Sequence, residues 1–596
     1  LEERGQWGEQ TGASRIDLQP LGDAAAAQVV ANLLGGSGLP QDVLTRIVDT
    51  AEGNPLYVEQ LLSMLIDRGA LIEVNGQWVR GSAAVDIDVP PTIHALLEAR
   101  LDQLGRAERA TVEPAAVMGM EFPQAGLSEL APTAVRPTLG EHLSVLARKQ
   151  FVHLSMSVDA SARYRFHHQL VRDTVYNGLL KRARAQLHID FVRWADRVNA
   201  DRDRALEFEE ILGYHLEQAH RYLSELGPLD DAGAAIGLDG AQRLGRAARR
   251  AFARGDMHAA ANLFQRAVTL LREDDPKRIE LLPELGEVLL DMGDFAQART
   301  ALTKAQTAAE RAGNARIAAS AQLLRMRVRF YSAEPGEDWR DETLRIANDA
   351  IPLFEREGAH PELARAWRLM AFVHGIAGRY GEAADDTTRS MEHARLAGDE
   401  RLIARNAMGL AITGLLGPTP VPQVIAHCEK VIADGLSDRH AESKLLCTLA
   451  QLHAMGGDFD KARALYRRGR SLLRELGQGV NAASTGIDIL FIEMLAGDLA
   501  AAEREVMPDY EFLAHAGETF FMSTMAALIS RIVRDQGRDD EALSFSKIAE
   551  RATAADDVES QALWRSIRAP IVARAGDLAE AEFLARAAVE MAQKTD

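Results

Sequence analysis

Cysteine and long apolar runs are both scarce in this chain. Only Cys428 and Cys447 occur among its 596 residues, which excludes a disulfide framework and a cysteine-based metal cluster. No apolar run approaches the roughly 20 residues that cross a bilayer, and no signal peptide opens the sequence. We therefore predict a cytoplasmic protein without a membrane partner, and we assign this chain no metal ligands and no catalytic residues.

Positive charge is also in short supply. Lysine and arginine number 68 against 87 aspartates and glutamates, for a net charge of −19. Nucleic-acid binding needs basic patches, so contact with nucleic acid through this chain is not expected. The chain is too long for one core, and its hydrophobic content of 47% is typical of folded domains. Several folded domains are therefore predicted.

A glycine followed by aspartate or arginine returns about every 40 residues in the C-terminal part, which is the signature of a solenoid. These glycines are Gly255, Gly293, Gly378, Gly457, Gly497, Gly537 and Gly576, and the alanines five residues after them are Ala260, Ala298, Ala383, Ala462, Ala502, Ala542 and Ala581. The two wide gaps are each about twice the period, with Gly336 and Gly417 near their midpoints. Nine units are predicted, and the units around Gly336 and Gly417 are degenerate.

Each unit is predicted to be a helix, a glycine turn and a second helix. Glycine supplies a left-handed residue after the first helix, aspartate caps the second, and alanine lets the two helices approach closely. The pattern resembles the tetratricopeptide repeat (TPR) in a longer form. We predict a mainly α protein whose residues 239–596 form a TPR-like superhelix of about nine helix pairs, which offers a long curved surface to a protein or small-molecule ligand.

The residues before the repeats divide into smaller parts. Residues 15–21 have the pattern of a short strand, and a helical module follows, closed by a hairpin at Asn75-Gly76. Three helices and two strands joined by a polar tip predict a winged helix in residues 89–200. The helix before the tip carries only two basic residues, so a structural role is favoured over DNA reading. Residues 201–238 are predicted to be linker helices, and 227–240 has the most linker-like composition.

Several segments resemble signal-transduction ATPases with numerous domains (STAND). The matching segments are AEGNPLYVEQLL (51–62), VPPTIHALLEARLDQL (89–104), YRFHHQLVRDTVY (164–176) and EILGYHLEQAHRYLSELGP (210–228). The last is most similar to the bacterial branch in which a nucleotide-cyclase domain precedes the ATPase, and related branches carry a LuxR-type DNA-binding domain. The resemblance implies that residues 1–88 are the end of an NTPase core and its helical lid, followed by the winged helix and a sensor solenoid.

The chain departs from that family in one large respect. It contains no G-x-x-x-x-G-K-S/T loop and no recognisable Walker B strand, so the phosphate cradle and the magnesium ligands are missing. In the family this core lies just upstream, and the chain starts at Leu1 without a methionine, so we expect a fragment of a longer protein. No cofactor is predicted for this chain alone; ATP or ADP with magnesium is expected for the longer protein, whose core and effector domain would be partners of these residues.

The resemblance assigns nucleotide contacts to Gly53, Asn54, Pro55 and His168. The family's proline at this turn lies against adenine, and its winged-helix histidine reaches the β-phosphate of ADP. The alternatives are a simple helix start, since proline suits the first turn, and a histidine that bonds to backbone. His167, next to His168, is another candidate for the phosphate contact.

A second candidate site lies on the solenoid. Arg325, Arg329, Trp367 and His374, together with Arg327, could line its concave side and bind an anionic ligand or an acidic peptide. A run of charges is more often a solvated face, so this surface is a hypothesis.

Two further groups are predicted to be structural. Asp173 and Tyr176 share one helical turn, with Arg172 adjacent, and are expected to fix their helix against its neighbours. His215 and Tyr222 share a helical face and are expected to pack in a core.

Three functions from different classes remain open on the sequence. The chain is either the regulatory and sensor portion of a STAND-type ATPase upstream of a nucleotide-cyclase effector, a stand-alone TPR scaffold for protein binding, or part of a LuxR-type transcription regulator. Without the phosphate loop, the chain alone should hydrolyse no ATP.

Overall fold

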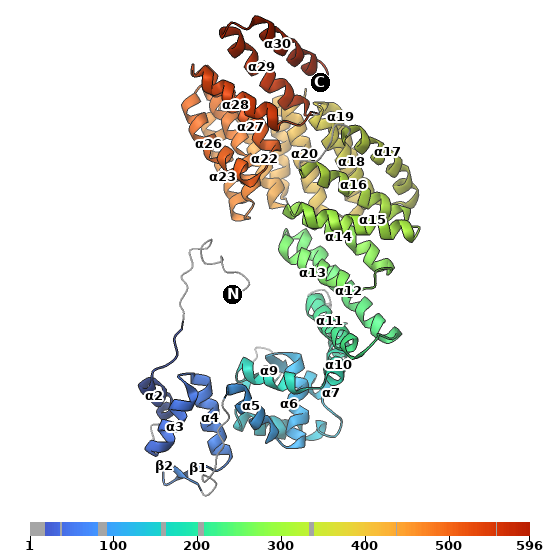
Figure 1. Cartoon of the computed structure of the whole chain (residues 1–596). Helices are drawn as coiled ribbons and strands as arrows, with labels where there is room; N and C mark the ends of the chain where they lie inside the picture. The colour runs from blue at the N-terminus through green and yellow to red at the C-terminus, as the bar shows by residue number, and fades with distance from the viewer. Residues whose placement is uncertain are drawn as a thin grey trace. The chain divides into compact units, whose positions relative to one another are not determined.

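The computed structural model describes residues 18–35, 39–81, 92–155, 162–200, 208–332, 339–436, 438–555 and 557–595. The chain divides into two compact units, Leu1–Gly240 and Ala241–Asp596. Nearly all of the regular structure in the described residues is helical (Figure 1), which confirms the predicted mainly α class. The boundaries predicted at 88, 200 and 238 stay predictions.

The first unit begins with a small helical module. Its elements are α2 (Asp23–Leu33), α3 (Gln41–Ala51), α4 (Pro55–Asp67), β1 (Leu71–Val74) and β2 (Gln77–Arg80). Asn75 and Gly76 between the strands both have positive φ, 54° and 78°, which confirms the predicted hairpin turn. Residues 18–21 are not in a strand, so the strand predicted for 15–21 is wrong over its described part, and the rest lies outside the described residues.

The next part of the first unit combines helices with a three-stranded sheet. The elements are α5 (Ile93–Asp102), α6 (Arg106–Met118), β3 (Glu121–Pro123), α7 (Gln124–Leu130), α8 (Leu139–Arg148), β4 (Val152–Ser155), β5 (Arg163–Phe166) and α9 (Gln169–Gly178). The antiparallel order is β3-β5-β4. The sequence predicts β4 and β5 but misses β3, because three residues are too few to show an alternating pattern. Residues 156–161 of the predicted tip lie outside the described part.

Long helices follow the sheet, and one of them corrects a prediction. The helices are α10 (Lys181–Ala200), α11 (Glu209–Leu226) and α12 (Asp231–Ala253). The linker predicted for 227–240 is therefore wrong from Asp231 onward. Asp230 Oδ1 accepts from the Gly233 N–H at 2.8 Å, which starts the helix, and Ile236 packs against a buried cluster of α10 and α11. That packing offsets the cost of about 1 kcal/mol for each helical glycine.

The described part of the second unit is a stack of nine helix pairs, as the sequence predicts. The pairs are α12 with α13 (Met257–Thr269), α14 (Pro276–Met292) with α15 (Phe295–Arg311), α16 (Ala315–Tyr331) with α17 (Trp339–Glu357), α18 (His360–Ile376) with α19 (Tyr380–Ala397), α20 (Glu400–Leu416) with α21 (Val421–Asp434), α22 (Arg439–Met455) with α23 (Phe459–Glu475), α24 and α25 (Gly479–Ser484 and Gly486–Ala496) with α26 (Leu499–Ala516), α27 (Phe520–Asp535) with α28 (Asp539–Ala552), and α29 (Val558–Arg574) with α30 (Leu578–Ala592).

The repeated glycine and alanine have the predicted roles. All seven repeat glycines have φ between 70° and 97°, where only glycine is free of strain. All seven alanines are at most 8% exposed. In five units the aspartate after the glycine caps the second helix through its side chain. The repeat register read from the sequence is therefore confirmed.

Three pairs depart from the regular pattern. Gly336 lies outside the described residues, and Gly417 has an extended backbone with φ −97° and ψ −168°, so no left-handed turn forms in the fifth pair. In the seventh pair the first helix is broken at Thr485. The segment Gly479–Ala496 is long and apolar enough to cross a membrane, contrary to the expectation from sequence, but half of it is buried among the neighbouring helices.

Distant repeats touch within the second unit. The rings of Phe330 on α16 and Phe520 on α27 lie 5.2 Å apart, and Tyr380 at the start of α19 donates a hydrogen bond to Glu559 Oε2 on α29 at 3.2 Å. The third and eighth pairs, and the fourth and ninth, are thus in contact. The array coils back on itself.

Candidate functional site

The Gly53 turn is held tightly against the start of the described chain. Leu21 N–H donates to Gly53 O at 2.8 Å, Gly53 has φ 76°, and a Cβ at this position would meet Leu21 O at 2.3 Å. Asn54 caps α4, because its side chain accepts from Tyr57 N–H at 3.2 Å, and Pro55 is the first residue of that helix. All three residues thus have a structural role, and their contact with a nucleotide stays a prediction.

His168 is the N-cap of α9. Its Nδ1 accepts from Leu170 N–H at 3.1 Å, so the ring is bonded to backbone, as in the structural alternative, and Nε2 is the nitrogen left to meet a ligand. His167 contacts α4 instead, with Nε2 2.8 Å from Glu59 Oε1. The Gly53 turn leads into α4 and His168 leads into α9, so one contact joins the two elements that carry the predicted nucleotide residues.

The contact between Glu59 and His167 shifts the pKa values of both side chains. The hydrogen bond with Glu59 raises the pKa of His167, and the same hydrogen bond lowers the pKa of Glu59. About a third of the His167 side chain is exposed. The pair therefore favours opposite charges on α4 and on the segment after β5, although solvent screens part of their attraction.

A second set of contacts joins the same two modules and was not foreseen from the sequence. Arg100 on α5 is 3% exposed and donates to Gln60 on α4, to Lys149 O at 2.6 Å and to Asp67 at 3.3 Å. Ser63 on α4 donates to Gln150 Oε1. A buried arginine must be paired to be tolerated, but nothing in the local pattern around Arg100 distinguishes it from a solvated residue.

Two of the segments that carry the family resemblance meet in a buried histidine–tyrosine cluster. Tyr176 OH lies 2.8 Å from His188 Nε2 and 3.0 Å from Tyr222 OH, and the Nδ1 atoms of His188 and His215 are 2.8 Å apart. His215 and Tyr222 are each 4% exposed, which confirms their predicted packing. Burial lowers the pKa of His188 to about 2 and that of His215 to about 3, so both rings are neutral at physiological pH.

The basic and acidic residues around this cluster fix α9 in place. Arg172 Nε donates to Ala116 O at 2.7 Å, its Nη1 lies 2.9 Å from Asp173 Oδ1, and its guanidinium lies 4.7 Å from the Tyr176 ring centre. These contacts agree with the predicted structural role of Arg172, Asp173 and Tyr176. The cluster clamps α9, α10 and α11 together.

The predicted ligand residues of the solenoid do not converge on one pocket. Arg325 donates to Gln306 on α15, Arg329 to Glu342 on α17, and buried His374 lies 2.8 Å from Asp386 on α19. The Arg389 guanidinium lies 4.5 Å from the Trp367 ring centre. These side chains point toward the second helices of the pairs, so a ligand surface built from them stays a prediction without a shared cavity.

A different row of arginines does come together, on the first helices of the pairs. We call it the inner arginine row: Arg327, Arg365, Arg368, Arg401 and Arg405. Arg401 and Arg405 on α20 lie 2.7 and 3.1 Å from Asp291 on α14. Helices three pairs apart can meet only on the side where the superhelix converges, so the row lies on its inner face. Only Arg327 of this row is among the sequence candidates.

Helical geometry explains why the other residues were missed. Arg325 and Arg329 are four residues apart and share one face of α16, whereas Arg327 lies two residues from each and therefore faces away from both. On α18, Arg365 and Arg368 share a face, and Trp367 and His374 share another. The spacing of these residues in the sequence is enough to assign them to their helical faces. It does not show which face is turned toward the inside of the superhelix.

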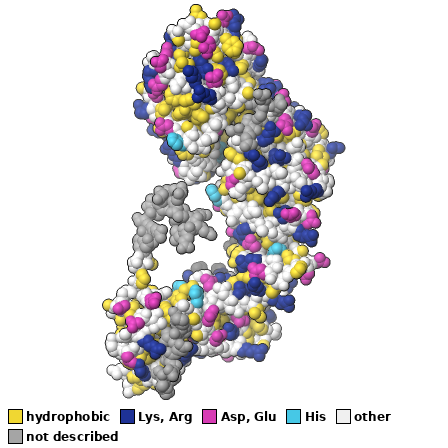
Figure 2. Space-filling model, in the orientation of Figure 1, with side chains coloured by type: hydrophobic (Ala, Val, Ile, Leu, Met, Phe, Trp, Pro, Cys, Tyr) yellow, Lys and Arg dark blue, Asp and Glu magenta, His cyan; other side chains and the backbone are white. Residues whose placement is uncertain are grey.

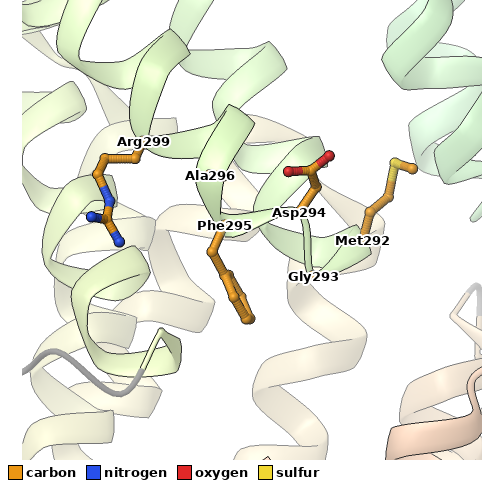
Figure 3. A pocket seen from close by; sticks show the side chains of 6 residues that line it. All are labelled: Met292, Gly293, Asp294, Phe295, Ala296 and Arg299. Atoms are coloured by element: carbon orange, nitrogen blue, oxygen red, sulfur yellow. The ribbon is translucent and has the colours of Figure 1, made fainter. Parts of the chain in front are cut away.

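An open hollow lies next to the row, at the turn between α14 and α15. It has a volume of about 770 Å³ and is lined by Met292, Gly293, Asp294, Phe295, Ala296 and Arg299 (Figure 3). Phe295 is stacked on Tyr331 at 6.4 Å, and Tyr331 on Phe372 of α18 at 6.0 Å. We call these three rings the aromatic ladder. It runs from the hollow to the helix that carries Arg368.

The described residues offer no metal centre. No group of three or more His, Cys, Asp or Glu side chains among them could hold a metal ion. Cys428 and Cys447 are free and buried, and burial raises the pKa of both thiols, to about 12 for Cys428. These thiols are therefore protonated and unreactive at physiological pH.

Comparison with known proteins yields distant likenesses only. No protein-family model matches the chain. An uncharacterized protein of Rhizobium meliloti (strain 1021) is 28% identical over 168 residues, which are 28% of this chain and 15% of that protein. The matched part thus spans a small fraction of the length of this relative.

Solved structures with similar helical architecture include proteins from signalling systems. A STAND protein with a tetratricopeptide repeat sensor from Pyrococcus horikoshii is 13% identical, with 91% of this chain and 74% of that chain covered and a TM-score of 0.36. A Rap protein complexed with competence and sporulation factor is 11% identical, with 64% and 99% covered and a TM-score of 0.45. The Rap conjugation gene regulator of plasmid pLS20 in complex with the Phr* peptide is 13% identical, with 63% and 98% covered and a TM-score of 0.32. At these scores no ligand or activity follows for this chain.

Proposed function

We propose that this chain is the cytoplasmic regulatory and sensor portion of a STAND-type signal-transduction ATPase. The solenoid binds a protein, peptide or small-molecule ligand on its inner face. The helical lid belongs to residues 1–88 and the winged helix to residues 89–200, in which the order of elements α6-β3-α7-α8-β4-β5 suits that fold. The NTPase core and an effector, a nucleotide cyclase in our proposal, are supplied by residues outside this chain.

The observation that carries the proposal is the contact between Glu59 and His167. It joins α4, which begins at the Gly53 turn, to the segment that leads into His168. A nucleotide held by an adjoining core would touch both α4 and the His168 segment. A ligand that shifts one of these elements relative to the other would therefore change how tightly the nucleotide is bound. Because the pair is partly exposed and not fully buried, it can open at moderate cost.

The residues present fit a contact with one side of bound ATP or ADP. They do not form the loop that would hold its phosphates. The backbone of the Gly53 turn is packed on Leu21, and His168 offers one ring nitrogen after capping α9. When bound, the nucleotide with its magnesium supplies the phosphoanhydride bond and the charge that distinguish two states of the switch. The residues of this chain would bind its edge, and Glu59 with His167 would hold the lid against the winged helix.

The proposal is tested in the longer polypeptide that contains both this chain and the segment preceding it in its reading frame. His168→Asn keeps an N-cap side chain but removes the ring nitrogen, whereas His168→Ala removes both. Both variants should bind ADP more weakly, by about 1.5–3 kcal/mol, and show higher basal output, with only His168→Ala also losing thermal stability. If His168→Asn binds ADP as tightly as the wild type, His168 serves only as a cap.

A protein-binding scaffold without a nucleotide switch is the second candidate. The inner arginine row favours it, because a ligand surface on the superhelix needs no ATP to operate. A preceding segment without a phosphate-binding loop would support this function and contradict the first.

A further inference from the structure

Carboxylates are distributed unevenly along the inner arginine row. Asp291 contacts Arg327, Arg401 and Arg405 at 3.7, 2.7 and 3.1 Å. Asp438 on α22 lies 3.5 Å from Arg401 and 3.1 Å from Arg405. On the face seen in Figure 2, charged side chains of both signs are interspersed. Within the row, these two carboxylates serve only three of the five arginines.

The carboxylates gather at the Arg365 end of the row. Glu287 lies 2.9 Å from Arg365 and 3.9 Å from Arg327. Glu287, followed by Asp399, Glu362 and Glu284, raises the pKa of Arg365. This end is therefore rich in negative charge, while Asp291 and Asp438 supply carboxylates to Arg401 and Arg405.

Arg368 is the member of the row without a carboxylate partner among the described residues. Its Nη1 donates to Asn406 Oδ1 at 3.0 Å, and Asn406 is itself held by Ser390 at 2.8 Å. Burial lowers the pKa of Arg368 to about 10, and Arg405 and Arg327 add to this effect. The guanidinium stays charged at physiological pH at an energetic cost, which an anion placed beside it would relieve.

The aromatic ladder adjoins Arg368. Phe372 follows Arg368 by four residues on α18, and Tyr331 follows Arg327 by four residues on α16, so both rings share the inner face with the arginines. Tyr331 is 45% exposed and stacks between Phe295 and Phe372. A ligand that reaches Arg368 therefore meets an accessible aromatic surface one helical turn away.

The free space around these groups determines the direction of approach. A cavity beside Arg327 and Arg365 has a volume of only about 10 Å³, which is room for about one water molecule. The hollow at Phe295, by contrast, is open and about 770 Å³ in volume. This arrangement favours a ligand that lies over the aromatic ladder and extends one anionic group toward Arg368.

We propose that Arg368, Tyr331 and Phe372 bind an acidic peptide segment in which an aspartate or glutamate stands two positions from an aromatic or large apolar residue. This inference rests on ligand binding by the solenoid and names the ligand's class. Arg368 and Phe372 are four residues apart on α18, a rise of about 6 Å. Alternate residues of an extended peptide point to the same side, about 6.6 Å apart. The spacing of Arg368 and Phe372 thus matches an acidic residue and an aromatic one separated by a single residue.

The test measures binding of three short probes to the full chain by NMR and calorimetry. The probes are N-acetyl-Glu-Ala-Phe-amide, its glutamine analogue N-acetyl-Gln-Ala-Phe-amide and its alanine analogue N-acetyl-Glu-Ala-Ala-amide. The first should bind about ten-fold or more tightly than the glutamine analogue, as expected for one charge-assisted hydrogen bond. Arg368→Gln, which keeps a donor for Asn406, should abolish this preference, and Tyr331→Ala should abolish the preference over the alanine analogue.

The control is Arg325→Gln, the same substitution on a residue that donates to Gln306 away from the row, and it should leave all three affinities unchanged. Equal binding of the glutamate and glutamine probes, or no binding of any probe, overturns the proposal. Inorganic phosphate binding at Arg368 as tightly as the peptide indicates a small-anion site and also overturns it. Should Arg368→Gln fail to fold, exposed Tyr331 still provides the test. The response of ADP affinity to His168→Asn is independent of these outcomes, so the proposed function can fail separately.

Discussion

Ala502→Leu tests how closely the repeat alanines control the approach of paired helices. Ala502 is fully buried in the cluster that contains Leu490, Val506 and Ile529. Three additional carbons at this position would have to enter a cluster of buried side chains, so we expect overpacking to cost roughly 1–3 kcal/mol. Ala500 on the same helix is exposed, and Ala500→Leu should change stability by less than about 0.5 kcal/mol.

The effect of Ala502→Leu should also be local. Each pair of a solenoid contacts mainly its neighbours, so its stability adds to theirs without spreading far. Hydrogen exchange measured by mass spectrometry should be about 5- to 150-fold faster in α25–α27, because each 1.4 kcal/mol is a factor of ten. Exchange in α13 and α14 should be unchanged. Equal protection of α25–α27 in Ala502→Leu and Ala500→Leu would refute the argument that close helix approach depends on this alanine.

Two further predictions concern the first unit. The raised pKa of His167 stabilises the contact fully below the ordinary value of 6.5, and this stabilisation is lost as the pH rises through the raised pKa. The lowered pKa of Glu59 stabilises the contact fully above the ordinary value of 4.5, and this stabilisation is lost as the pH falls through the lowered pKa. Exchange of α4 amides, corrected for intrinsic rates, should therefore be slowest between these values, and Glu59→Gln should remove this dependence; an unchanged profile would show that the pair is not coupled to docking. Arg100→Met leaves Gln60 and Lys149 O without their buried donor and should destabilise the first unit by about 3–5 kcal/mol. Urea denaturation measures this, and a loss below about 1 kcal/mol would contradict a structural role for Arg100.

Local chemistry explains why some of the fold was predictable. The turn of each repeat depends on a left-handed glycine, an aspartate cap and a small residue five positions after the glycine. These lie close together in the sequence, so the preferences of Gly457, Asp458 and Ala462 are the same in a short segment as in the superhelix. The hairpin at Asn75 and Gly76 is predictable for the same reason. The error at 227–240 arose because composition alone cannot show that Ile236 has a core to pack against.

The candidate nucleotide residues show the limit of local reasoning. Sequence resemblance selects Gly53 and His168, and the structure supplies their structural partners, Leu21 and Leu170. The contact that connects their elements, between Glu59 and His167, joins residues 108 apart in the chain. Neither residue carries a local signal of its partner, because ion pairs depend on how modules dock.

The sequence by itself determined the repeat, its register and the positions of its turns, because each depends on the conformational preference of one residue and its near neighbours. Only the tertiary structure decided which helical face is turned inward. Arg325 and Arg327 are equally basic and two residues apart, yet Arg325 donates to Gln306 on the preceding helix, α15, whereas Arg327 forms an ion pair with Asp291 on α14. The path of the superhelix determines the inner face because it brings Arg401 on α20 to Asp291 on α14, 110 residues earlier in the chain. The periodicity of a single helix contains no sign of this contact.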